Sequence, residues 1–276
     1  MSFVESVLYG FVSGLTEIFP VSSRAHQALL RYLFGAATRN SFQELLVHIG
    51  VLLAIFVCCA DVLSGLRLEQ TALTRNRRRS SRAQVSRNFY DLRLLKTAAI
   101  ALVIGLMLYI LTSKFEKKLL LLLLFWLLNG IFLLLADHTS RGNRDSRTMS
   151  GLDGIVMGIA GALEVFPGIS RTGMISAYAA ARGADSQNVV NWAVLLGIPA
   201  MLLAGCFDVV GIVSNGFQIV DFAAFLGCVA SGLAAFGGAY FAISLYKSLL
   251  DHSGFAQFAY YSIGAALFSF VLYLIT

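Results

Sequence analysis

The chain has 276 residues, of which 58% are hydrophobic and only 13% are charged. Its mean hydropathy is +0.76. Soluble domains are usually about 45–50% apolar and about 25% charged. This composition excludes a soluble enzyme, and it excludes a disordered chain because too much apolar surface would be left in water. The sequence therefore predicts an all-α polytopic membrane protein with a single integral domain over residues 1–276.

The net charge of +6 is concentrated rather than spread along the chain. A basic loop at residues 67–93 lies between two apolar runs and carries much of the excess. A loop of this kind indicates orientation by the positive-inside rule, so we expect it on the cytoplasmic side and expect no nucleic-acid partner. Residues 137–150 carry three more arginines and lie two predicted spans later, on the same side. This scheme places both termini outside a bacterial plasma membrane.

Two apolar regions differ from ordinary spans because proline and polar residues interrupt them in the middle. They are residues 3–34 and 153–182, and each half is too short to cross the bilayer. Such segments are typical of re-entrant helix-loop-helix hairpins. The remaining apolar runs predict six transmembrane helices at residues 42–64, 94–113, 119–136, 189–213, 219–246 and 256–275.

The two interrupted regions repeat each other at a constant offset of 147 residues. Six positions match without a gap: Gly14 with Gly161, Glu17 with Glu164, Phe19 with Phe166, Pro20 with Pro167, Ser23 with Ser170, and Arg24 with Arg171. The chain then divides into repeat one (residues 1–136), a linker (137–150) and repeat two (151–276). Each repeat is one hairpin plus three spans. Because three is odd, the second hairpin enters from the opposite face, which predicts an inverted-topology repeat.

An inverted repeat brings the two hairpin tips together near the middle of the membrane. There, free N–H groups at helix ends, two arginines, and the hydroxyls of Ser22, Ser23, Ser170 and Thr172 favour an anion, with phosphate as the natural candidate. The two glutamates need a separate reason, since they repel phosphate. They can balance the arginines, hold a divalent cation or accept a proton. His26, one turn beyond Ser23, is a further candidate base or nucleophile.

These motifs resemble those of the bacitracin-resistance type undecaprenyl-diphosphate phosphatases. The segment from Glu17 to His26 is similar to the family signature Glu-Phe-Leu-Pro-Val-Ser-Ser-Thr-Gly-His, and the segment from Pro167 to Gly173 is similar to Pro-Gly-x-Ser-Arg-Ser-Gly. The resemblance implies hydrolysis of undecaprenyl diphosphate to undecaprenyl phosphate and inorganic phosphate, which recycles the lipid carrier for cell-wall synthesis.

The repeat and the resemblance together suggest roles for individual residues. Glu17, Ser23, His26 and Arg171 would be catalytic, with Ser23 or His26 as nucleophile or proton-transfer group. Glu17 and Glu164 would hold the cation, Mg²⁺ or Ca²⁺. The substrate would be bound by Ser22, Arg24, Glu164, Ser170, Thr172 and Gly173. A homodimer is a further expectation.

The chain departs from the family pattern at three places. Ser13 replaces an acid, Arg24 and Ala25 replace Thr-Gly, and Glu164 replaces an apolar residue. One interpretation is that the missing carboxylate has moved from position 13 to 164. The other is that hydrolysis has been lost and a symmetric site retained for transport, as a flippase for polyprenyl phosphate or a carrier of another anion. Elsewhere, we expect His48 to pack within a span. We expect Asp208 to lie at a span end, either solvated in the interface or packed between the repeats.

Overall fold

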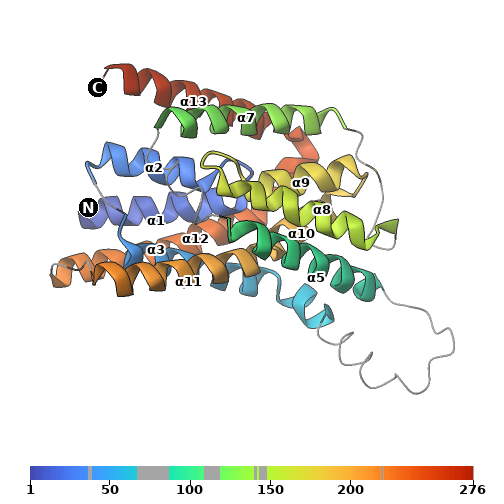
Figure 1. Cartoon of the computed structure of the whole chain (residues 1–276), viewed down its shortest axis with the longest axis horizontal. Helices are drawn as coiled ribbons and strands as arrows, with labels where there is room; N and C mark the ends of the chain where they lie inside the picture. Colours follow the sequence, from blue (N-terminus) through green and yellow to red (C-terminus); the bar gives the residue numbers. More distant parts are fainter. Residues whose placement is uncertain are drawn as a thin grey trace.

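The computed structural model describes residues 1–36, 39–66, 87–108, 119–139, 142, 148–217, 219 and 221–275. Every regular element within these ranges is a helix. Most of the basic loop and much of the 137–150 linker lie outside them. The helices run roughly parallel to one another in Figure 1. The prediction of an all-α protein is confirmed for the part of the chain that the structure describes.

The first hairpin consists of α1 (Phe3–Ile18) and α2 (Ser23–Leu33). Helix α1 begins at a capping box in which Ser2 and Glu5 satisfy each other's backbone N–H groups. It ends because Phe19 precedes a proline and is forced into an extended conformation, with ψ of 151°. The proline thus marks the tip of the hairpin, where the chain turns back into α2.

The second hairpin repeats this construction with α8 (Gly151–Ala162), the short η3 (Leu163–Val165) and α9 (Arg171–Ala181). Ser150 and Asp153 form its capping box. At its tip, Gly168 adopts a φ of +110°, and a Cβ there would collide with the backbone of α7. Only glycine allows this close approach. Figure 1 shows the two hairpins entering from opposite ends of the molecule, with their tips in the middle.

The other named helices have 10 to 32 residues. They are α3 (Ser41–Cys58), α5 (Arg87–Leu106), α7 (Leu119–Asp137), α10 (Ser186–Leu195), α11 (Gly197–Asn215), α12 (Phe222–Ser253) and α13 (Ala256–Ile275). Five stretches are long and apolar enough to cross a membrane: α3, α7, α10 with α11, α12 and α13. The chain is therefore a multi-pass membrane protein.

Two predicted spans differ in detail from the helices observed. The span predicted at 189–213 is divided at Leu196 into α10 and α11. Pro199 explains the break, because it has no N–H to donate to the Leu195 carbonyl and its ring crowds that group. The span predicted at 42–64 ends as α3 at Cys58, and a separate helical segment follows at residues 60–66.

Each hairpin packs against a helix from the other half of the chain. Helix α1 lies on α12, and α8 lies on α5. Glycines permit both contacts: a Cβ at Gly14 would collide with the carbonyl oxygen of Ala235, and one at Gly158 would collide with that of Ala98. Each half of the chain therefore supplies the helix against which the hairpin of the other half packs.

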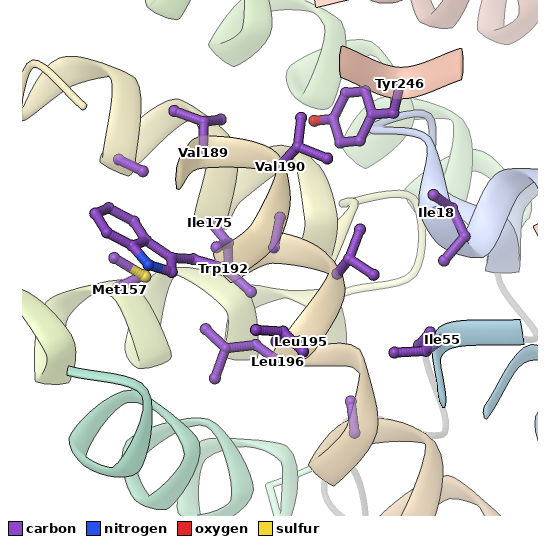
Figure 2. Packing of buried hydrophobic residues seen from close by; sticks show 14 of the residues in the cluster. Ile18, Ile55, Met157, Ile175, Val189, Val190, Trp192, Leu195, Leu196 and Tyr246 are labelled. Atoms are coloured by element: carbon purple, nitrogen blue, oxygen red, sulfur yellow. The ribbon is translucent and has the colours of Figure 1, made fainter. Parts of the chain in front are cut away.

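The buried apolar core surrounds α10, as Figure 2 shows with Trp192, Leu195 and Leu196 between the neighbouring helices. Ile18 and Ile55 close the core on the side of the first hairpin. The outer helices instead expose large apolar side chains, such as Val213 and Ile275, which are 80% and 75% exposed. An apolar exterior around a packed core is what a lipid environment requires.

Candidate functional site

The two hairpin tips meet end to end in the centre of the molecule. Glu17 lies at the end of α1, and Thr172 lies at the start of α9. The Thr172 hydroxyl donates a hydrogen bond of 2.9 Å to the Glu17 backbone carbonyl. This bond satisfies one of the carbonyl groups that the end of α1 leaves without a partner in the helix. The contact fixes the first residues of α9 against the last residues of α1.

Arg171 is the central side chain of the site. Its Nη2 lies 3.2 Å from Glu17 Oε2, and its Nη1 lies 3.4 Å from Glu164 Oε2. All three residues are buried, and Arg171 is only 3% exposed. The structure thus brings together the two glutamates of the repeat through a single guanidinium. Arg24 joins the same group more loosely, with its Nε 3.9 Å from Glu164 Oε1.

Helix α7 holds the two tips in register through one buried side chain. The Asn129 amide Nδ2 donates to the Pro20 carbonyl at 3.1 Å, and its Oδ1 accepts from the Ser170 backbone N–H at 2.9 Å. The neighbouring Trp126 Nε1 donates to the Val21 carbonyl at 2.9 Å. Asn129 is completely buried. Sequence reasoning missed it because a lone asparagine in a leucine-rich span carries no recognisable pattern.

A cavity that is partly open to the outside lies beside the paired charges. Glu17, Glu164 and Arg171 line it, together with one face of α2 and one face of α11. Along α2, Arg24, Gln27 and Arg31 recur at helical spacing on the cavity side. With Arg39, four arginines line the cavity against two glutamates. Arg31 and Arg39 also pair with buried Glu44 and Asp208 next to the cavity, so carboxylates balance the arginines. The N–H groups of several guanidiniums in one place suit a ligand with anionic oxygens.

The predicted hydroxyl and glycine positions lie at the tips rather than in the cavity. Ser170 caps α9, its Oγ accepting from the Gly173 N–H at 3.1 Å. Ser22 has a φ of 67°, rare for a residue with a side chain, and its buried hydroxyl has no hydrogen-bond partner among the described residues. Ser23 is the first residue of α2 and is 6% exposed. Neither Ser22 nor Ser23 lines the cavity as the described residues shape it.

His26 lies on the side of α2 that faces α7 and α13. Its Nδ1–H donates to the Ser22 carbonyl at 2.8 Å, so its Nε2 accepts from the Tyr261 hydroxyl at 2.8 Å. The imidazole stacks on the Tyr261 ring and meets Trp126 edge-on. Both ring nitrogens are therefore engaged, and the structure does not bring His26 to the cavity.

A second polar cluster extends the site toward α3 and was missed from the sequence. Glu44 accepts a hydrogen bond from the Tyr9 hydroxyl and pairs with Arg31 at 3.3 Å. Asp208 accepts from Arg39 at 2.7 Å and from His48 at 2.6 Å. The expectation that Asp208 lies in the interface is wrong, because its partners hold it in the interior at 2% exposure. The helical spacing of Arg24, Gln27 and Arg31 along α2 was the sequence feature that could have indicated this cluster.

The placement of the glutamates does not fit a preformed cation site. Glu17 and Glu164 both pair with Arg171, whose charge opposes a divalent ion. Within the described ranges, no group of three or more His, Cys, Asp or Glu side chains could hold a metal ion. The residues would need oxygen ligands from a bound diphosphate to complete such a site. The predicted cation stays a prediction.

Comparison with known proteins gives the same family as the motifs. A family model described as "Bacitracin resistance protein BacA" matches residues 6–268. The chain belongs to this family. It is 31% identical to the undecaprenyl-diphosphatase of Nitrosococcus oceani over 97% of the chain and 98% of the relative. It is 29% identical to that of Alkaliphilus metalliredigens over 95% of both chains. It is 26% identical to undecaprenyl-diphosphatase 1 of Shouchella clausii, over 98% of this chain and 96% of the relative.

Proposed function

We propose that the chain hydrolyses undecaprenyl diphosphate to undecaprenyl phosphate and inorganic phosphate. The observation that carries this proposal is the cavity at the hairpin tips, which is lined by four arginines, with buried Arg171 among them. A lipid diphosphate needs dense positive charge in a place that excludes most water. Family membership and the names of full-length relatives favour the same substrate.

Arg171 is the residue best placed to bind the diphosphate. Its guanidinium already spans two carboxylates, and the same planar fork can hold two phosphate oxygens. Phosphoryl transfer is driven mainly by positioning and by neutralising charge on the reacting oxygens. Arg24 and Arg31 extend the positive surface along α2. Glu17 and Glu164 hold the guanidinium in place before substrate arrives.

Ser23 stays the predicted nucleophile and His26 a predicted proton-transfer group. Ser23 precedes Arg24 at the start of α2, where the positive end of the helix dipole favours an anion. Its oxygen would attack the terminal phosphorus and pass its proton to His26, while the bond from that phosphorus to undecaprenyl phosphate breaks and the leaving oxygen keeps the electron pair. Substitution tests both residues: Ser23→Ala and His26→Ala should each abolish most phosphate release if the predicted roles hold.

The polyprenyl tail has a separate apolar path. A groove of apolar residues between α3 and α11 adjoins the polar cavity and shares His48 and Met201 with it. Ile49 and Leu202 on its walls are exposed to the surroundings, as lipid-facing side chains are. The diphosphate would occupy the cavity while the tail lies in the groove.

The inverted repeat supports a site reached by both hairpins. The α1–α12 and α8–α5 contacts are counterparts under the 147-residue offset, as a pseudo-two-fold axis in the membrane plane requires. On this scheme the hairpins are re-entrant, both termini lie outside the bacterial plasma membrane, and the linker lies in the cytoplasm. Cysteine labelling of intact cells at residues 2 and 145 would test the orientation.

Transport without hydrolysis is the less favoured reading, because the relatives matched over almost their whole length are named as diphosphatases. The purified full chain in detergent should release phosphate from undecaprenyl diphosphate. The release is measured with and without EDTA. Arg171→Ala should abolish the release. If the unchanged protein releases no phosphate with any divalent cation yet still binds the lipid, hydrolysis is rejected.

A further inference from the structure

His48 stands at the boundary of the cavity with a hydrogen-bonding pattern that differs from that of His26. It lies on α3 and lines the same cavity as Arg171 and Glu17. Its Nδ1 lies 2.6 Å from Asp208 Oδ2 on α11. A carboxylate accepts but does not donate, so Nδ1 carries the hydrogen. In the neutral imidazole, the pair therefore favours the tautomer in which Nε2 carries no hydrogen and can accept one.

The second ring nitrogen of His48 is the one available for chemistry. Nε2 has no hydrogen-bond partner among the described residues. It is not fully buried either, since it does not belong to the buried polar atoms of those residues that lack a partner. At His26, by contrast, the Tyr261 hydroxyl occupies the corresponding nitrogen. Of the two histidines, only His48 combines a place on the cavity wall with an unoccupied nitrogen.

Asp208 is itself held rigidly. Its Oδ1 accepts from Arg39 Nη2 at 2.7 Å while Oδ2 faces His48. A buried carboxylate on Nδ1 orients an imidazole and stabilises the imidazolium that forms when Nε2 takes a proton. The Ser22 carbonyl that contacts His26 carries no charge and offers less of this stabilisation. The Asp208–His48 pair is thus built for proton transfer.

We propose that His48 is the general base of the hydrolysis and that Asp208 is its positioning residue. The inference rests on the proposed function. Hydrolysis consumes one water molecule, whether water attacks the diphosphate or a phosphorylated Ser23. In either case the water oxygen bonds to phosphorus and its proton passes to His48 Nε2. The bond from phosphorus to the leaving oxygen breaks, and that oxygen keeps the electron pair.

The test uses a substitution that separates structure from chemistry. In His48→Asn, the amide Nδ2 can take the place of ring Nδ1 and still donate to Asp208, but nothing replaces Nε2. The purified protein in detergent is given undecaprenyl diphosphate, and phosphate release, elution volume and thermal midpoint are measured. We expect kcat to fall by about 10²–10⁴-fold, the typical contribution of a general base, with KM within threefold. Elution and thermal midpoint should match those of the unchanged protein.

Two further variants complete the design. Asp208→Asn keeps the size of the side chain and removes its charge, and should lower kcat by at least about tenfold with little change in KM. His252→Asn is the control, because His252 is an exposed residue near the end of α12, and it should leave kcat unchanged. If His48→Asn keeps kcat within threefold while the unchanged protein is active, the general-base role is overturned and the hydrolysis proposal survives. If the unchanged protein is inactive, both fail.

Discussion

Asn129 offers a sharp test of how the hairpin tips are held. Its amide joins the Pro20 carbonyl of the first tip to the Ser170 N–H of the second. In Asn129→Leu, a side chain of similar size replaces these bonds and leaves both backbone groups buried without partners. Each such group costs about 1–3 kcal/mol, so the free energy of unfolding should fall by about 2–6 kcal/mol.

The same substitution should also impair hydrolysis, because Ser170 precedes Arg171. A small displacement of the α9 start would move the guanidinium away from the phosphate, and displacements of about 1 Å can cost about 10²-fold in rate. The assay is phosphate release from undecaprenyl diphosphate, with unfolding followed in a detergent titration. The matched control is Asn215→Leu, which removes only an exposed bond to the Gly211 carbonyl. An Asn129→Leu protein as stable and active as the control would refute this account of the tips.

Three further substitutions test the cavity and the groove. Arg171→Lys keeps the charge but loses the planar fork, and should lower kcat/KM for undecaprenyl diphosphate by about 10²-fold; activity within threefold would argue against two-point binding. Gly205→Trp fills the groove, where an added Cβ would lie 3.5 Å from Leu45 Cδ1. It should raise KM about tenfold for undecaprenyl diphosphate but not for farnesyl diphosphate. Equal effects on both substrates would place the tail elsewhere. Glu164→Gln should lower kcat at least about tenfold if the carboxylate has moved from position 13, and full activity would reject that relocation.

Much of the fold was accessible from the sequence because membrane helices are long apolar runs with clear limits. The prolines of the two hairpins also have strong local effects: Pro20 forces Phe19 into an extended conformation and so ends α1. The break at Leu196 was harder to place, since a proline in a span bends some helices and interrupts others. Neighbouring helices decide between those outcomes.

The central charges of the site were predictable, whereas their surroundings were not. The repeat itself marked Glu17, Glu164 and Arg171, and the structure places each of the two carboxylates within 3.4 Å of the Arg171 guanidinium. Asp208 and His48 lie 160 residues apart and belong to no local motif. Their meeting depends on how α3 packs against α11, which no spacing along the chain encodes.

The exchange of partners between the two halves has a consequence for biosynthesis. Helix α1 is made first, yet the helix that its glycines contact, α12, begins only at Phe222. The first hairpin must therefore wait, partly unpacked, until most of the chain has been translated. The second hairpin finds α5 already present when it emerges. The two hairpins are therefore made under different conditions, because only the second has its packing helix available at once. Truncations near the C-terminus should destabilise the first hairpin more than the second.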